Sequence, residues 1–419
     1  MEQRLKHFLD KHFGYSGPIL ATAVLFFICS FSLGLMERRS MMVILILVVF
    51  SIWKGRFFHW STWRKSLPYL TFFLVHVLFL INTSNLTDGW VDVQSKALLI
   101  VLPVCVFCWD RSSFILNSAI WGLGIGTTLR LLTGLCLGLP EALSTGTTDS
   151  ITYINLSMGM HPTYTGMYVL LFQAYLVGQI KRGDLGTRLW PWFILTALFI
   201  ALLSSKMALG GEIILFITAI YYLVRYQRKN KRHWVGLSIA SVFFVVSLLF
   251  NPLIARRFER LLPVKEPVEQ VLEAKEEATP TEKEATTDQP TGSHRSHIWS
   301  AALEVWKANK WVGVGTGDVN EALAEQYAKD GYAIGVERGY NAHNTFLQVL
   351  VAFGFVGSLV FLYLLFHVFS TFQKKRPTWK YAYFVILIGF LFIEAMFERQ
   401  SGLLFFCLFL PLLSAKNLD

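Results

Sequence analysis

The stretch Gly339–Gly357, GYNAHNTFLQVLVAFGFVG, decides the fold, because a polar segment there turns directly into a long apolar run. The run continues to Val368 and is long enough to cross a bilayer, which takes roughly 20 mostly apolar residues. His343 and Asn344 are therefore expected just outside a spanning helix, at the membrane–water boundary. The long polar segment 251–345 ends at this point.

The composition predicts an all-α polytopic integral membrane protein. Hydrophobic residues make up 54% of the 419 residues, and the mean hydropathy is +0.47, which is more apolar than soluble domains tolerate. The net charge of +10 does not indicate nucleic-acid binding, because Lys and Arg cluster in short loops between apolar runs. We therefore expect membrane lipids, and no nucleic acid, as partners.

The apolar runs predict about 12 transmembrane helices, three of them short for a span. They lie at 17–35, 41–53, 67–84, 97–109, 113–138, 163–180, 190–205, 207–224, 234–250, 346–368, 381–397 and 402–414. With the N-terminus inside, more than half of the 38 Lys and Arg residues fall in inside segments. The positive-inside rule then predicts cytoplasmic termini and one large external, periplasmic loop between spans 9 and 10.

Three regions follow from this topology. We predict an N-terminal bundle of about nine spans over residues 1–250, an external loop over 251–345, and a C-terminal bundle of about three spans over 346–419. Within the loop, residues 264–292 are rich in Glu, Thr and Pro and lack aromatic residues. Such a segment buries too little apolar surface to fold, so we expect a disordered acidic insert.

The rest of the loop is expected to form interfacial helices. Trp299, Leu303 and Trp306 recur at helical spacing, which predicts an amphipathic helix whose tryptophans suit the membrane interface. The glycine-rich WVGVGTGD that follows predicts a turn rather than a phosphate-binding loop, because no strand precedes it. A second short helix is expected near Val319–Lys329.

Arg295 and His343 are the leading catalytic candidates. A guanidinium can bind a phosphate through two parallel hydrogen bonds, and an imidazole can accept a proton near neutral pH. From spacing alone, a solvated loop residue or a histidine bound by backbone explains either side chain equally well. His294, His297 and His343 also offer three nitrogens for zinc, an alternative that no nearby cysteine supports.

Lys206 and Arg130 interrupt apolar sequence, where a charge is costly and marks a functional or paired site. Lys206 divides what would otherwise be one apolar stretch, and its alternative role is to extend to the interface at a tight hairpin. Arg130 lies within the fifth run. A structural ion pair with Glu212, Glu394 or Glu398 explains Arg130 as well as a ligand contact does.

Three segments together resemble the O-antigen ligase and polymerase-like superfamily of bacterial envelope glycosyltransferases. Residues 293–318, SHRSHIWSAALEVWKANKWVGVGTGD, are similar to its Arg, aromatic and Gly-rich pattern. Residues 341–357, NAHNTFLQVLVAFGFVG, resemble its His-Asn motif, and residues 202–211, LLSSKMALGG, its Ser-Arg segment. Lys206 stands where the family has arginine, which keeps the charge and loses the planar fork.

The resemblance implies glycan transfer from an undecaprenyl-diphosphate carrier to an acceptor hydroxyl, at the periplasmic face of the bacterial inner membrane. The acceptor of a ligase is lipid A–core in lipopolysaccharide biosynthesis, and no cofactor or metal is expected. An O-antigen polymerase, a protein O-oligosaccharyltransferase and a polytopic transporter or flippase remain open. The implied site has catalytic His343 and Arg295; diphosphate-binding Lys206, Arg295, Arg338 and Arg130; and supporting Asn344, His161 and Trp299.

Overall fold

The computed structural model describes residues 17–36, 60–108, 113–182, 188–249, 251, 254, 292–373 and 378–414. Within these ranges the regular elements are all helices, which confirms the all-α prediction. The predicted span at 41–53, the chain termini and residues 264–291 of the acidic insert lie outside the described ranges.

The N-terminal half of the described chain is a series of helices joined by short turns. Its elements are α2 (Gly17–Leu35), η2 (Trp60–Ser66), α4 (Leu67–Leu78), η3 (Phe79–Asn82), α5 (Leu86–Lys96), α6 (Leu98–Cys108), α7 (Ser113–Thr145), η4 (Asp149–Ile151), α8 (Tyr153–Leu156), α9 (Pro162–Gln179), η5 (Ile180–Arg182), α11 (Trp190–Leu203), α12 (Lys206–Tyr226) and α13 (Lys231–Leu249).

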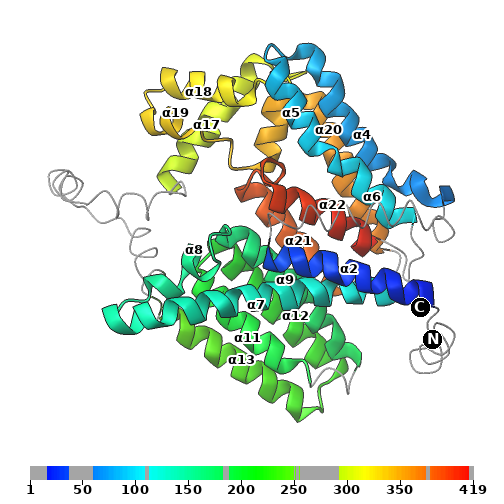
Figure 1. Cartoon of the computed structure of the whole chain (residues 1–419), viewed down its shortest axis with the longest axis vertical. Coiled ribbons are helices and arrows are strands. Elements are labelled where there is room, and N and C mark those ends of the chain that lie inside the picture. Colours follow the sequence, from blue (N-terminus) through cyan, green and yellow to red (C-terminus); the bar gives the residue numbers. More distant parts are fainter. Residues whose placement is uncertain are drawn as a thin grey trace.

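The C-terminal half contains the predicted loop helices and the last bundle. Its elements are α17 (Gly292–Ala308), α18 (Val319–Lys329), α19 (Ala333–Arg338), α20 (Thr345–Gln373), α21 (Thr378–Ile393), η6 (Met396–Glu398) and α22 (Gln400–Ser414). Figure 1 shows α17, α18 and α19 together beside α5 and α20, apart from the bundle of α7, α9, α11, α12 and α13.

Six helical stretches of the described chain are long and apolar enough to cross a membrane. They are Thr62–Asn82, Leu86–Phe107, Phe114–Thr145, Lys206–Tyr226, Lys231–Leu249 and Thr345–Phe372. Four shorter apolar helices accompany them, at Thr22–Leu35, Trp190–Leu203, Trp379–Ile393 and Gln400–Ser414. The chain is therefore a multi-pass membrane protein, while the count of twelve spans and the external side of the loop stay predictions.

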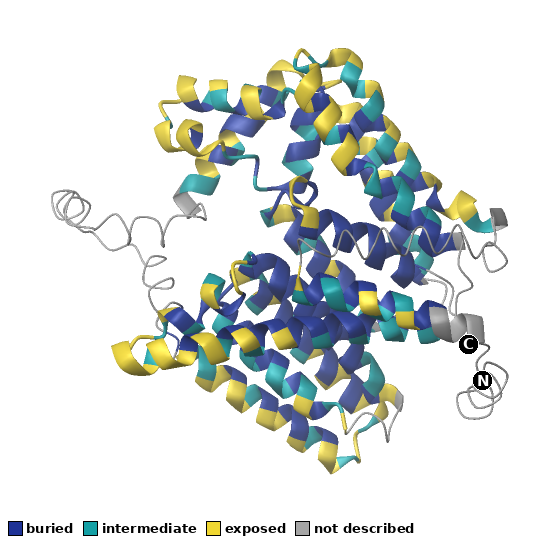
Figure 2. Ribbon diagram, viewed as in Figure 1, coloured by how far each residue is buried: buried dark blue, intermediate teal, exposed yellow. Residues whose placement is uncertain are grey.

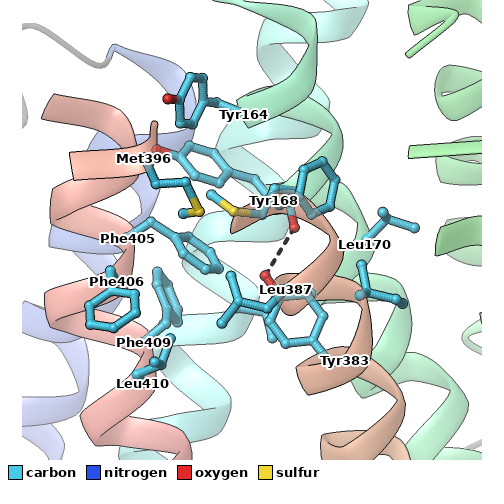
Figure 3. Packing of buried hydrophobic residues seen from close by; sticks show 14 of the residues in the cluster. Tyr164, Tyr168, Leu170, Tyr383, Leu387, Met396, Phe405, Phe406, Phe409 and Leu410 are labelled. Atoms are coloured by element: carbon cyan, nitrogen blue, oxygen red, sulfur yellow. Dashed lines mark hydrogen bonds between the residues drawn. The ribbon is translucent and has the colours of Figure 1, made fainter. Parts of the chain in front are cut away.

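Helices α9 and α22 form the centre of the molecule. Both are largely apolar, and residues 162–177 and 401–414 are buried throughout, as expected for helices enclosed by others. Tyr168 stacks on Phe405 with ring centroids 5.2 Å apart, and its hydroxyl donates to the carbonyl of Ser401. Figure 3 shows these rings packed with Tyr383, and Figure 2 shows that buried residues concentrate in this region.

Helix α20 is broken at Gly354, and the glycine-rich turn repairs the break. Gly354 has φ 58° and ψ −156°, a conformation that L side chains rarely adopt. The N–H of Phe355 donates to the Lys310 carbonyl, and the N–H of Val314 donates to the Val351 carbonyl, each at 2.9 Å. Backbone groups freed by a break in an apolar helix need such partners. The predicted turn is thus confirmed, and it fastens α17 to α20.

The predicted helix at Val319–Lys329 is α18, and the predicted amphipathic helix is α17. The face of α17 that packs inward is aliphatic rather than aromatic, because Ile298, Ala301, Ala302 and Val305 are its buried residues. Leu303 is exposed, and Trp306 donates from Nε1 to the Lys310 carbonyl at 3.2 Å.

Candidate active site

The segment before α20 fixes His343 in an unusual conformation. The Asn344 side chain caps α20, since its Oδ1 accepts from the N–H groups of Phe346 and Leu347 at 2.9 and 3.1 Å. The Gln348 side chain accepts from the Ala342 N–H at 3.0 Å. His343 itself has φ 43°, a left-handed value that is uncommon for residues other than glycine. Such strain persists only where surroundings impose it, and it gathers at functional sites.

A buried carboxylate faces the His343 ring. Glu394 Oε2 lies 3.9 Å from His343 Nδ1, and the Glu394 side chain is 5% exposed. The Thr345 hydroxyl donates to the Glu394 carbonyl at 2.6 Å and accepts from the Met396 N–H at 3.0 Å. The first residue of α20 therefore holds the turn after α21 against the histidine loop.

Arg295 reaches this carboxylate from the first turns of α17 and interacts electrostatically with Glu394 and Tyr153. Its Nε and the Nε1 of Trp299, one turn further along α17, are buried donors without a hydrogen-bond acceptor among the described residues. A buried donor left unpaired costs about 1–3 kcal/mol. Two such donors on one face of a helix indicate a place for an acceptor that the chain itself does not supply.

His343, Glu394, His161, Arg295 and Arg399 act on one another electrostatically and form the His343 cluster, in which burial and the two arginines dominate the electrostatics. Burial, with these two arginines nearby, lowers the pKa of His343 to about 4. Burial and the same cations lower the pKa of His161 to about 3. Burial raises the pKa of Glu394 to about 7, although both arginines act in the opposite direction. Near neutral pH both imidazoles are therefore neutral, and Glu394 is partly ionised.

The N-terminal ends of several helices gather around the cluster. A Cβ at Gly166 would lie 2.6 Å from the Ala208 side chain, and one at Gly211 would lie 2.6 Å from Leu170. Residue numbers increase in the same direction along the two helices, from the 166–208 contact to the 170–211 contact. Helices α9 and α12 are therefore parallel, and their first residues lie at the same end of the bundle. Gly402 of α22 adjoins Tyr164 in the first turns of α9. Helix N-termini carry partial positive charge and favour anions.

The structure brings most of the predicted site residues together. His343, Arg295 and His161 interact electrostatically, Asn344 caps α20, and Trp299 follows Arg295 on α17. His161 precedes α9, and its Nδ1 accepts from the Thr163 N–H at 3.4 Å. Lys206 is exposed at the first turn of α12, at the end of the bundle that His161 shares.

The Arg130 side chain joins α7 to the end of α2. Its Nε and Nη2 donate to the Leu35 carbonyl at 3.0 and 2.7 Å, at the C-terminal end of α2, where a cation is favourable. Glu212 instead accepts from Gln173 at 3.1 Å. The acceptor in these hydrogen bonds is a backbone carbonyl, which no sequence pattern identifies.

Replacing Arg130 with Met is therefore expected to lower stability more than turnover. A charge-assisted hydrogen bond contributes about 1.5–3 kcal/mol. Because both Arg130 bonds go to the same Leu35 carbonyl, we expect the free energy of unfolding to fall by about the contribution of one such bond. Thermal unfolding in detergent measures it, and glycan transfer is normalised to folded protein. Lost turnover at unchanged stability would instead place Arg130 in the substrate site.

Arg338 is exposed in the last turn of α19, which ends at Gly339 with φ 56°. His294 and His297 contact Tyr332, the first at 2.6 Å between Nδ1 and the hydroxyl and the second by ring stacking at 5.4 Å. These contacts direct both histidines to α19. Among the described residues, no three His, Cys, Asp or Glu side chains gather as metal ligands.

Glu394 and Arg399 are the site residues that the sequence analysis missed. The sequence analysis names Glu394 only as one of three possible partners of Arg130, whereas in the structure Arg130 donates to the Leu35 carbonyl. A signal was available, since Glu394 lies within the apolar run 381–397 and Arg399 lies in the short turn before the next run, where charged residues are costly and mark functional sites.

Comparison with known proteins agrees with the motifs. A search of curated proteins found no match to this chain. A family model described as O-antigen ligase matches residues 191–362, a range that contains Lys206, Arg295, His343 and the broken helix α20. The match supports a glycosyltransferase of envelope glycan biosynthesis, acting on lipid-linked glycan and a glycan acceptor. Residues 191–362 of this chain thus match the O-antigen ligase family, as the resemblance predicted.

Proposed function

We propose that this protein transfers a glycan from undecaprenyl diphosphate to an acceptor hydroxyl, with lipid A–core as the acceptor. The observation that carries the proposal is the pairing of a neutral, strained His343 with a buried carboxylate, among two arginines and several helix N-termini. A base and a set of fixed cations are the two requirements of this reaction.

His343 is the proposed base. Its neutral ring accepts the proton of the acceptor hydroxyl as the oxygen attacks the anomeric carbon, and Glu394 stabilises the imidazolium that forms. The bond between that carbon and the diphosphate oxygen breaks on the opposite side, so the transfer inverts the anomeric centre. No metal is assigned to these steps, because the protein side chains meet both requirements.

The leaving diphosphate develops negative charge, which preorganised donors stabilise in the transition state. We assign this role to Arg295, and its buried Nε, which lacks an acceptor among the described residues, supports the assignment. Arg399 and the exposed Lys206 at the N-terminus of α12 are further cations for the diphosphate. We propose that the apolar helices hold the polyprenyl chain, with the reaction at the periplasmic face.

Deletion of the gene, followed by analysis of envelope glycolipids, tests the proposal. A ligase is expected to leave lipid A–core without polymer and to let lipid-linked polymer accumulate. Shortened polymer on lipid A–core would identify a polymerase, and unmodified lipid glycans with lost protein glycosylation would identify a protein transferase. Complementation with wild type and with His343→Gln separates the catalytic role from the presence of the protein.

Replacing Glu394 with Gln is expected to change the pH dependence of transfer. The wild-type rate should rise as the pH passes through about 7, because the Glu394 carboxylate forms there. A carboxylate raises the pKa of a neighbouring imidazole by about 1–3 units and so makes it a stronger base. The Glu394→Gln variant should therefore be at least about tenfold slower than wild type at pH 8, and its rate should lack the rise near pH 7.

The matched control is Glu325→Gln on the exposed side of α18, which should keep the wild-type profile. A Glu394→Gln variant that retained the same rise would assign it to another group and exclude Glu394 from the reaction.

A further inference from the structure

A cavity of about 340 Å³ lies on the other side of the turn that carries Glu394. Its walls come from α4, α5, the glycine-rich turn, the start of α18, the first half of α20 and η6. Exposed Asp88 and Asn320 stand at its rim, and buried Gln348 and Thr345 lie deeper. The volume is at the lower end of the roughly 300–1,000 Å³ of small-molecule sites. Of these four residues, Thr345 holds the Glu394 turn and Gln348 holds the segment before α20, while Asp88 and Asn320 have no role in the reaction described above.

The charges of the cavity are opposite in sign to those of the His343 cluster. Lys96 is buried and lies 2.7 Å from Asp92 and 3.5 Å from Glu398. With Asp88, the lining has three carboxylates and one ammonium, a formal charge of −2 with His76 counted as neutral. Such a lining repels phosphate, so the cavity is unsuited to the diphosphate that the cluster would bind.

The remaining lining is aromatic and amide. Phe353 and Phe397 line the cavity together with His76, whose ring lies 4.7 Å from that of Phe353. Carboxylate oxygens and the Gln348 amide accept hydrogen bonds from hydroxyl or ammonium groups, and aromatic rings pack against the apolar face of a cyclic molecule. A few polar groups converging on a partly apolar hollow are typical of a ligand site.

The cavity and the reaction centre share one wall. Thr345 and Ala395 line the cavity. Ala395 follows Glu394 directly, and Thr345 is two residues after His343, and both Glu394 and His343 belong to the cluster. In the same way Glu398 lines the cavity, while the next residue, Arg399, lowers the pKa of His343. A molecule in the cavity therefore lies next to the reacting groups without displacing them.

We propose that this cavity binds a phosphate-free sugar unit of the glycan substrate, neutral or carrying an amino group, and excludes phosphorylated sugars. This proposal rests on the proposed function for its substrate, but the binding itself does not require transfer. It adds a specificity site: the cluster holds the charged end of the donor, and the cavity selects a sugar by its hydroxyl and amino groups.

Saturation-transfer NMR on the detergent-solubilised full chain tests the binding, with methyl glucoside, glucosamine and glucose 6-phosphate as probes. Methyl glucoside or glucosamine should give a signal, and glucose 6-phosphate should give none. Val91→Trp should abolish the signal, because Val91 lines the cavity and is 60% exposed, so that a larger side chain is tolerated. The matched control is Leu86→Trp, 53% exposed on the same helix and outside the lining.

Asp88→Lys is the second variant, should Val91→Trp fold poorly. It changes the formal charge of the lining from −2 to zero, and glucose 6-phosphate should then give a signal. Equal binding of glucose 6-phosphate by the wild type, or an unchanged signal in both variants, would overturn the proposal.

Transfer kinetics then identify the substrate that carries the sugar. Loss of binding shared by ground and transition states raises KM more than it lowers kcat, here by about tenfold or more. A higher KM for the acceptor assigns the cavity to the acceptor glycan, and a higher KM for the donor assigns it to the transferred glycan. Sugar binding without any transfer activity would reject the proposed function and leave the cavity assignment standing. Transfer with unchanged KM values in Val91→Trp would reject the cavity assignment and leave the proposed function standing.

Discussion

His343→Gln is expected to lower turnover by about 10²–10⁴-fold, the usual contribution of general acid–base catalysis. Glutamine can keep a hydrogen bond to the acceptor but cannot accept its proton at neutral pH. The α20 cap that Asn344 provides remains in place in this variant. Binding of the lipid-linked donor should therefore change little while the rate falls.

The measurement is transfer with purified donor and acceptor, with donor binding determined separately. His297→Gln is the matched control, because this exposed histidine of α17 stacks on Tyr332 and lies outside the cluster. If His343→Gln kept near-normal turnover, His343 would only position the acceptor, and another group would have to take the proton.

Arg295→Ala should lower turnover by about 10²–10³-fold, the loss found when one preorganised donor to a developing anion is removed. Arg295→Lys should restore part of the rate, because the charge returns without the planar fork. A second effect distinguishes this role from a structural one. Arg295 lowers the pKa of Glu394, so in Arg295→Ala the rise of the rate with pH should move to higher pH.

Turnover and its pH profile are measured together for both variants. Arg232→Ala, at an exposed arginine in the first turn of α13, is the control for the loss of one surface cation. A fall in activity with an unmoved pH profile and a proportional loss of folded protein would assign Arg295 to stability alone.

The sequence by itself determined the features that depend on neighbours along the chain. Apolar runs of sufficient length predicted the helices, and eleven of the twelve runs coincide with helical segments, the remaining run lying outside the described residues. The glycine-rich turn was predictable, because only glycine adopts positive φ readily. The His-Asn motif, with its Arg and Lys companions, sufficed to identify the family.

Only the tertiary structure decided which charges meet. Glu394 and His343 are far apart in sequence and meet because Thr345 binds the turn after α21. Arg130, which looked like a ligand contact or an ion pair, donates to a carbonyl of α2. The negative cavity beside the cationic cluster likewise combines residues of α4, α5, the glycine-rich turn, α18, α20 and η6. Hydrophobic periodicity predicts that a segment is helical. The partner of a buried charge depends on which helices pack together, and the local sequence does not specify that.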